Sequence, residues 1–354
     1  MRVVVCGTTF GNIYLEAFRT PGFPFELTGI VARGSERSQA CAERHGVPLF
    51  TDVAEVPDDT DIACVVVRSA AFGGHGTDLV KAFLSRGIHV LQEHPVHHDE
   101  LAACLALARK HRVVYRLNSF YPHLEPVRHF LDAVNTHFAH QVPLFVDAAC
   151  AVQVAYPLFD MLGQALGKIR PFELTALPLP AEPAEGGTPF RSVAGVFGGV
   201  PLTLRVQNQI DAADPDNGLH LLHRITIGGA DGVLTLADTH GPLLWSPRLR
   251  VSAAMKDTFD FGGSDDTHLG LATTALIGPV VGPTFRTMLG KLWPDAAAAA
   301  LNDLRAAILA DEDPAIRGQY HLALCQVWQD LTAQLGYPEQ LAEAGRPVEV
   351  ASLR

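Results

Sequence analysis

The pattern of hydrophobic and polar positions gives the two parts of the chain different textures. Over the first 120 residues, short β-branched runs alternate with segments of helical periodicity, as in a parallel sheet covered by helices. We expect strands at 3–6, 26–32, 47–50, 61–67, 90–92 and 113–117, and helices at 12–19, 35–45, 75–86 and 99–111. This alternation predicts a doubly wound parallel sheet.

Beyond residue 120, strand-like runs replace the alternation. One helix is expected at 124–135, strands at 145–149, 193–197, 202–209, 224–227 and 233–237, and closing helices at 296–310 and 316–335. Residues 178–189 hold four prolines and two glycines, a composition typical of a surface loop. The sequence therefore predicts an α/β protein with an N-terminal domain of residues 1–120 and an α+β domain of residues 121–354 on a largely antiparallel sheet.

Composition narrows the classes of protein that this chain can belong to. Its 354 residues are 48% hydrophobic and 18% charged, which suits two folded domains, and the formal net charge of −11 comes without a basic stripe for nucleic acid. The apolar runs are far shorter than the roughly 20 residues of a membrane span. The first residues lack the features of a secretory signal, and the six cysteines are widely scattered. We expect a cytoplasmic protein that binds neither nucleic acid nor a membrane.

The turn after the first strand is a candidate dinucleotide site. It reads Gly7, Thr8, Thr9, Phe10, Gly11, at the place where such folds offer backbone N–H groups to a pyrophosphate. Only Gly7 matches the G-x-G-x-x-G fingerprint, because Thr9 and Asn12 hold its other two glycine positions. An ordinary glycine turn remains the alternative to a cofactor site.

The tip of the second strand bears on which dinucleotide would bind. It carries Arg33, Gly34, Ser35 and Arg37, and no acidic side chain stands at the end of the strand itself to hydrogen-bond a ribose 2′-OH. Arginine and serine donors suit a 2′-phosphate, so this tip favours NADPH/NADP+ over NADH. The alternative is a solvated helix start, with Ser35 as N-cap.

Two further strand ends carry polar side chains. Arg68 and Ser69 follow the fourth strand, while Glu93 and His94 end the fifth. Open α/β sheets bind their ligands outside the carboxyl ends of the strands, so we expect a hydride-transfer pocket at this edge, with Glu93 and His94 among the cofactor-binding residues.

This strand-helix-strand run resembles the glucose-fructose oxidoreductase and inositol dehydrogenase superfamily, whose motif after the strand reads E-K-P. Here His94 replaces the lysine, and Gln153 and Pro157 stand where the superfamily's later Asp and His would align. These replacements argue against ordinary sugar dehydrogenation and leave an imidazole that titrates near neutral pH. The resemblance also implies that Arg68, Ser69, Gly73, Gly74 and His75 pass beside the nicotinamide half of the cofactor.

A closer resemblance is to the thiazolinyl imine reductases of yersiniabactin and pyochelin siderophore biosynthesis, a branch of that superfamily. It is carried in order by blocks at matching spacing: Phe10-Gly11 with Tyr14-Leu15, residues 32–38, 61–69, Gly73-Gly74, Gly76-Thr77, 87–95, 118–123 and 238–242. The Glu93-His94-Pro95 and Phe120-Tyr121-Pro122-His123 blocks are the most informative.

This resemblance implies NADPH-dependent reduction of a thiazoline C=N bond to a thiazolidine, on an intermediate tethered to a carrier domain of a nonribosomal peptide synthetase. Tyr121 and His94 are the matching catalytic candidates, with Tyr121 favoured as proton donor and His94 orienting it or sharing the role. Packing at a domain junction is the alternative for Tyr121. By analogy we expect a homodimer. His97 and His98 fit a helix start better than a metal site, and no metal is expected.

Two other functions remain open at this point. The chain could be an NADP-dependent oxidoreductase of another small carbonyl, imine or sugar, with His94 in place of the lysine. A non-catalytic NADP(H)-binding regulatory or partner protein is the second alternative, since folds of this kind are retained after their chemistry is lost.

Overall fold

The computed structural model describes residues 1–179, 188–211, 214, 217–251, 256–257, 267–341 and 348. Most of the loop expected at 178–189 lies outside these residues. The chain forms two compact units. Unit 1 comprises Met1–Arg128, Phe159–Met161 and Pro283–Asp330, and unit 2 comprises His129–Leu158, Leu162–Gly282 and Leu331–Arg354.

Unit 1 is built on a six-stranded parallel sheet in the order β3-β2-β1-β4-β5-β6. This is the strand order of a dinucleotide-binding Rossmann sheet. Successive strands are added on one side of β1 up to β3, and β4 to β6 are added on its other side, so the switch point of the topology lies between β1 and β4. The predicted fold class of this part is confirmed. The strands are β3 (Leu49–Phe50), β2 (Glu26–Val31), β1 (Arg2–Cys6), β4 (Ile62–Val65), β5 (His89–Glu93) and β6 (Tyr115–Asn118).

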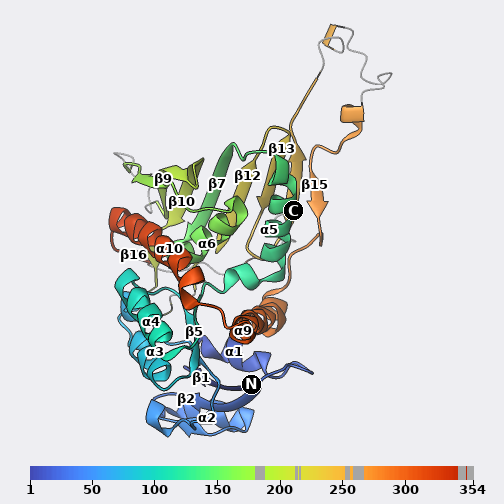
Figure 1. Ribbon diagram of the computed structural model, residues 1–354. Coiled ribbons are helices and arrows are strands. Elements are labelled where there is room, and N and C mark those ends of the chain that lie inside the picture. Colours follow the sequence, from blue (N-terminus) through green and yellow to red (C-terminus); the bar gives the residue numbers. More distant parts are fainter. Residues whose placement is uncertain are drawn as a thin grey trace. The chain divides into compact units, whose positions relative to one another are not determined.

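The helices of unit 1 begin and end where local chemistry favours it. The helix α2 starts after Ser35, whose side chain accepts a hydrogen bond from the Ser38 N–H, and stops at Gly46 in the left-handed conformation with φ 66°. Figure 1 shows α3 beside α4, and α1 beside α9. The helices are α1 (Gly11–Ala17), α2 (Glu36–His45), α3 (Gly76–Ser85), α4 (His98–His111), the short α8 (Phe285–Thr287), α9 (Trp293–Leu309) and most of α10 (Pro314–Leu335).

The C-terminal helices belong to a different unit from the one expected. We expected them to close the second domain, whereas α9 and all but the end of α10 group with the N-terminal sheet. The reason is their buried faces. In α9, Ala297, Leu301 and Leu304 are buried in the core, and in α10 the Cys325 thiol lies 3.3 Å from the Val96 carbonyl.

Unit 2 is built on an eight-stranded sheet in the order β15-β14-β13-β12-β7-β10-β9-β8. Every neighbouring pair is antiparallel except β7 and β10, which are parallel, so the expected largely antiparallel sheet is confirmed. Figure 1 shows most of these strands in green to orange. They are β15 (Ala275–Ile277), β14 (Leu243–Pro247), β13 (Gly232–Leu236), β12 (His223–Gly228), β7 (Phe145–Ala151), β10 (Val200–Gln207), β9 (Phe190–Phe197) and β8 (Glu173–Ala176).

Two further helices continue from unit 1 or return to it. The helix α5 (Glu125–His137) crosses from unit 1 into unit 2, and α6 (Ala155–Leu166) contributes Phe159–Met161 to unit 1. A two-stranded sheet joins β11 (Gln209–Ile210) to β16 (Glu339–Gln340). None of the helices described is long and apolar enough to cross a membrane. None of the six cysteines forms a disulfide.

Candidate active site

The residues predicted to form the site all belong to unit 1, at the carboxyl ends of its strands. β4 pairs with both β1 and β5, and β5 pairs with β6, with Glu93 opposite Asn118. The loops that follow these strands therefore leave the sheet along one edge, as predicted.

The turn from β1 into α1 has the features of a dinucleotide turn with one change. Gly7 has φ +96°, and a Cβ there would lie 2.6 Å from the Val66 carbonyl oxygen. Gly11 is buried, yet a methyl group there would meet only ordinary contacts, the nearest at 3.7 Å. At the third fingerprint position, Asn12 donates to the Thr8 carbonyl at 2.8 Å and accepts from Arg44 at 3.2 Å. Asn12 thus ties the turn to itself and to α2.

This turn fits an anionic ligand. Phe10 stands at the N-cap of α1 with φ −64° and ψ −26°, and its side chain does not cap the helix. Thr8 is buried and Thr9 is exposed. The chain's own packing does not require Gly11, whereas close approach of a pyrophosphate would.

At the tip of β2, the predicted residues differ in whether their side chains are bound by the chain itself. Ser35 is the N-cap of α2, and its side chain accepts from the Ser38 N–H. Gly34 takes φ +78° in the turn. Arg33 and Arg37 are both exposed, and neither forms an ion pair with another residue that the structure describes. The two guanidinium groups are therefore available to an anion.

The loop between β4 and α3 is held mainly by its own chain. The buried Ser69 hydroxyl donates to the Pro95 carbonyl at 2.6 Å, which joins the loop after β4 to the loop after β5. A Cβ on Gly74 would lie 2.0 Å from the Arg68 carbonyl oxygen, and Gly73 has φ +68°. The absence of a side chain at Gly74 thus lets the backbone of Gly74 pack closely against the backbone of Arg68. Arg68 and His75 are exposed and accessible to a ligand.

Glu93 and His94 form a nearly buried pair at the end of β5. The Nδ1 atom of His94 lies 2.9 Å from Glu93 Oε1 and 3.1 Å from the Asn118 carbonyl oxygen, and the side chains are only 8% and 11% exposed. The Asn118 carbonyl can only accept, so its hydrogen bond with Nδ1 requires a proton on that nitrogen. Proton exchange at His94 therefore takes place at Nε2.

Tyr14 and Asn118 hold the other oxygen of Glu93. The Tyr14 hydroxyl donates to Glu93 Oε2, and the Asn118 amide lies 3.4 Å from the same oxygen. Burial, and secondarily the Glu93 charge, raise the pKa of Tyr14 well above its usual value. Tyr14 therefore stays protonated and serves as a fixed donor to the carboxylate.

Tyr121 lies beside His94. Their ring centroids are 6.3 Å apart with an interplanar angle of 67°, an edge-to-face arrangement. Tyr121 also contacts Phe120 and Trp293, with centroids 5.5 Å and 6.4 Å away, and is 5% exposed. The structure thus brings the two catalytic candidates together, within a cluster of aromatic rings.

Sequence reasoning missed several members of this neighbourhood. Tyr14 stood in a block shared with the imine reductases, but no role could be given to it. Trp293 lies 5.7 Å from both Phe10 and Phe120 between ring centroids, although almost 300 residues separate it from the first strand. No local pattern marks a contact at that distance along the chain.

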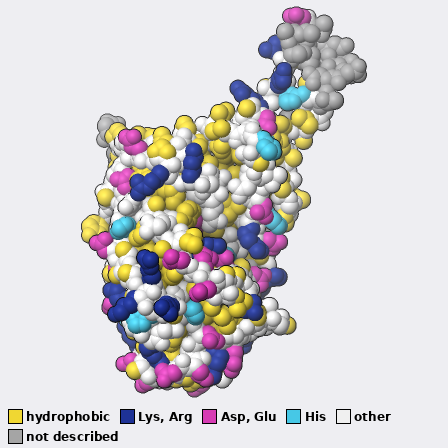
Figure 2. All heavy atoms as spheres, viewed as in Figure 1, with side chains coloured by type: hydrophobic (Ala, Val, Ile, Leu, Met, Phe, Trp, Pro, Cys, Tyr) yellow, Lys and Arg dark blue, Asp and Glu magenta, His cyan; other side chains and the backbone are white. Residues whose placement is uncertain are grey.

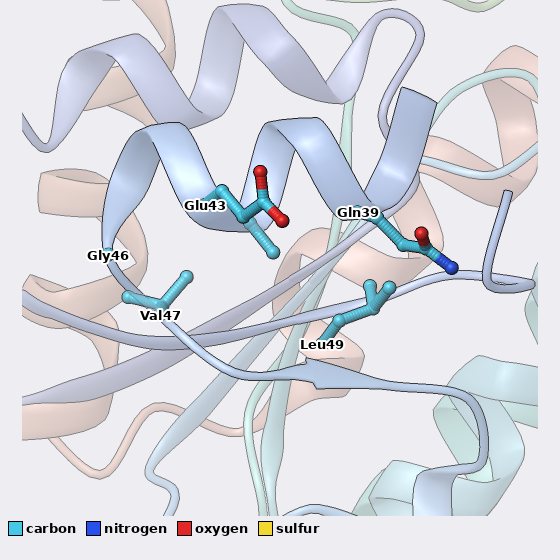
Figure 3. Close-up of a pocket in the computed structure, with 6 residues that line it drawn as sticks. Gln39, Glu43, Gly46, Val47 and Leu49 are labelled. Carbon is cyan, nitrogen blue, oxygen red and sulfur yellow. The ribbon is translucent and has the colours of Figure 1, made fainter. Parts of the chain in front are cut away.

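Two other features lie apart from this site. An open depression of about 380 Å³ is lined by residues of α2 and the segment that leads into β3, none of them a predicted site residue (Figure 3). His97 precedes α4, and the His98 Nδ1 atom lies 3.2 Å from Asp99. In the part of the chain that the structure describes, no three His, Cys, Asp or Glu side chains are grouped to hold a metal ion.

Comparison with known families agrees with this geometry. Residues 1–119 match the oxidoreductase family with the NAD-binding Rossmann fold, and residues 141–246 match the C-terminal domain of the Irp3-like thiazolinyl imine reductases. Together the two matches cover well over half of the chain. Among curated protein sequences, none matches the chain significantly.

Solved structures share the fold at low sequence identity. A UDP-N-acetylglucosamine 3-dehydrogenase from Acidithiobacillus ferrooxidans is 14% identical with a TM-score of 0.66, covering 94% of this chain and 97% of its own. A 3-ketoreductase from Actinomadura kijaniata in complex with NADP is 15% identical with a TM-score of 0.65, covering 96% and 99%. An oxidoreductase from Agrobacterium radiobacter in complex with NAD+, L-tartaric acid and magnesium is 11% identical with a TM-score of 0.65, covering 100% and 99%.

The two family matches fall on the two sheets in turn, the first on the Rossmann sheet and the second on the strands of unit 2 from β7 through β14. The chain is therefore an oxidoreductase of the NAD-binding Rossmann family, and a member of its branch with an Irp3-like C-terminal domain.

Proposed function

We propose that this protein reduces a thiazoline C=N bond to a thiazolidine, with NADPH as the hydride source. The observation that carries the proposal is the match of residues 141–246 to the thiazolinyl imine reductase C-terminal domain. The pairing of His94 with Tyr121, in place of the superfamily's lysine, supports it. The proposed substrate is an intermediate tethered to the carrier domain of a nonribosomal peptide synthetase.

In the proposed reaction, the protein must supply one proton. When bound, the nicotinamide supplies hydride to the imine carbon, and the imine nitrogen then needs a proton from a positioned acid. Tyr121 is the proposed donor, because a phenol is protonated at neutral pH. His94, whose Nδ1 is hydrogen-bonded to the Asn118 carbonyl with Glu93 beside it, orients the Tyr121 hydroxyl or returns a proton to it through Nε2.

The remaining parts of the proposal concern cofactor choice and assembly. Arg33 and Arg37 would hold the 2′-phosphate of NADPH, and the β1–α1 turn would hold its pyrophosphate. We further propose a cytoplasmic homodimer. Sedimentation of the purified protein tests the dimer, and a monomer at micromolar concentration would contradict it.

Turnover decides between this function and its alternatives. The assay follows NADPH oxidation with a thiazolinyl thioester analogue of the carrier-bound substrate, set against a panel of sugars and small carbonyl compounds. We expect turnover of the thiazoline alone. Turnover of a sugar without turnover of the thiazoline would overturn the proposal, and a protein that binds NADPH but turns over neither would be a binding protein.

A further inference from the structure

The segment that leads to Tyr121 contains a strained turn. Phe120 has φ 62° and ψ −61°, and the Tyr121 N–H donates to the Ser119 carbonyl at 2.7 Å. This is a γ-turn centred on a bulky residue, a rare and strained conformation. Such strain persists only where the surroundings hold it, and it clusters at functional sites. The chain reaches Tyr121 three residues after the end of β6, so the direction of the Tyr121 side chain depends on this turn.

Buried side chains hold the turn from both sides. The Oδ1 atom of Asn118 accepts from the Phe120 N–H at 3.0 Å. The Ser119 hydroxyl donates to the buried Asp160 carboxylate, whose other oxygen accepts from the Tyr320 hydroxyl at 2.8 Å. The two hydrogen bonds that hold the turn directly, those of Asn118 and Ser119, are both buried.

Asn118 also reaches the other half of the site. Its Nδ2 atom donates to the Tyr14 hydroxyl oxygen at 2.5 Å and lies 3.4 Å from Glu93 Oε2. Its carbonyl oxygen accepts from the His94 N–H at 3.0 Å and faces His94 Nδ1 at 3.1 Å. One residue therefore contacts the turn that aims Tyr121 and the groups that fix His94.

We propose that Asn118 is a positioning residue that sets Tyr121 and His94 in register for proton transfer. An amide suits this place because it presents an acceptor to Phe120 and donors to Tyr14 and Glu93 at once. A carboxylate of the same size would keep the acceptor, lose the donors and set a second negative charge beside Glu93. This inference rests on the proposed function only in the tests that measure kcat.

The first test is the isosteric variant Asn118→Asp. Displacing a positioned acid and its partner forfeits general acid catalysis, so kcat should fall about 100-fold. The Kd for NADPH should change by less than about twofold, because Asn118 touches neither the β1–α1 turn nor the arginines at the tip of β2. Asn208→Asp is the matched control, since Asn208 is a buried amide of unit 2 that donates to the Leu335 carbonyl. An unchanged kcat in Asn118→Asp overturns the proposal.

The second test isolates the turn. Phe120→Ala and Phe120→Gly both remove the ring, but only glycine adopts positive φ without strain. Removing the Asn118 side chain with Asn118→Ala should therefore lower kcat about tenfold more in the Phe120→Ala background than in the Phe120→Gly background. Equal losses in the two backgrounds would show that Asn118 does not hold the turn.

The third test needs no substrate. Nitrogen-15 NMR of histidine-labelled protein at neutral pH reports the tautomer of His94, with the resonance assigned by its loss in His94→Gln. We expect Nδ1–H in the wild type and an altered signal in Asn118→Asp. An unaltered signal counts against the inference. A wild type that does not reduce the thiazoline, yet shows this Asn118-dependent signal, overturns the proposed function and leaves the positioning role standing.

Discussion

At the scale of single residues, the carboxyl group of Glu93 organises its surroundings. One oxygen faces His94 Nδ1, and the other accepts from the Tyr14 hydroxyl. Carboxylate–imidazole pairs of this kind fix the tautomer and stabilise the charged ring when it forms. Under the proposed mechanism, this arrangement suits an imidazole that returns a proton to Tyr121, whose ring centroid lies 6.3 Å away.

The roles of the two candidates are separable by substitution. Tyr121→Phe should lower kcat by 100-fold or more, because general acid catalysis contributes about 10²–10⁴-fold, and His94→Gln should lower it less. The Kd for NADPH should stay nearly unchanged in both variants. Steady-state kinetics at saturating NADPH measure the effect, with Tyr337→Phe as control, since Tyr337 is 99% exposed. A fully active Tyr121→Phe with an inactive His94→Gln would exchange the two roles.

The arginines at the tip of β2 govern the proposed cofactor preference. Each charge-assisted hydrogen bond to a 2′-phosphate is worth about 1.5–3 kcal/mol, so Arg33→Ala with Arg37→Ala should raise the Kd for NADPH at least 100-fold. The Kd for NADH should hardly change. Fluorescence titration with both cofactors measures this, and Arg109→Ala on the exposed end of α4 is the control. An equal loss for both cofactors would contradict a 2′-phosphate site.

At the scale of elements, the loop between β4 and α3 offers a sharp test of packing. Gly74→Ala places a methyl group 2.0 Å from the Arg68 carbonyl oxygen, so the loop must rearrange. Overpacking of this kind costs about 1–3 kcal/mol, which urea unfolding measures as a lower free energy of unfolding. Gly270→Ala is the control, because a Cβ there meets nothing within 4 Å. Equal stability of the two variants would contradict the close approach seen at Gly74.

The sequence predicted the elements of the first sheet well, because each follows a clear period between glycine or polar turns. The helix α6 was missed. Its sequence is apolar apart from a few positions such as Asp160 and Gln164, and an apolar run of this kind does not by itself distinguish a helix from a buried strand. The strands β14 and β15 were also missed, since β15 is a short, exposed edge strand whose pairing depends on β14.

The part of the candidate site that lies at the ends of strands was predictable from the sequence. Glu93, His94 and Arg68 follow strands, and topology alone places such residues at one edge. The contacts of Tyr14 with Glu93, and of Ser119 with Asp160, join segments 79 and 41 residues apart. Contacts of that kind arise from tertiary packing, which no local period encodes.

At the scale of the whole molecule, three histidines make stability depend on pH. Burial lowers the pKa of His89, His123 and His321 below the usual value, and His89 Nδ1 accepts from the Val114 N–H, which requires its neutral form. The unfolded chain binds protons at these sites near pH 6.5, before the folded chain does.

Stability should therefore be fully present above about pH 6.5 and fall as the pH drops below it. Thermal unfolding measured from pH 8 to pH 5 checks this, and His89→Gln should flatten part of the decline. A melting temperature that rises on acidification would contradict the assignment of neutral histidines.

The assembly of unit 1 from distant segments has a consequence for how the protein is made. Its sheet is complete by residue 118, but α9, which lies against α1, and most of α10 come from residues 283–330. During translation at about 5–20 residues per second, the N-terminal sheet waits roughly 10 to 40 seconds for these helices to leave the ribosome. Its apolar surface stays uncovered for that time. The nascent chain is therefore a natural client for chaperones, and yields in cells should rise when translation and folding are slowed together by cooler growth.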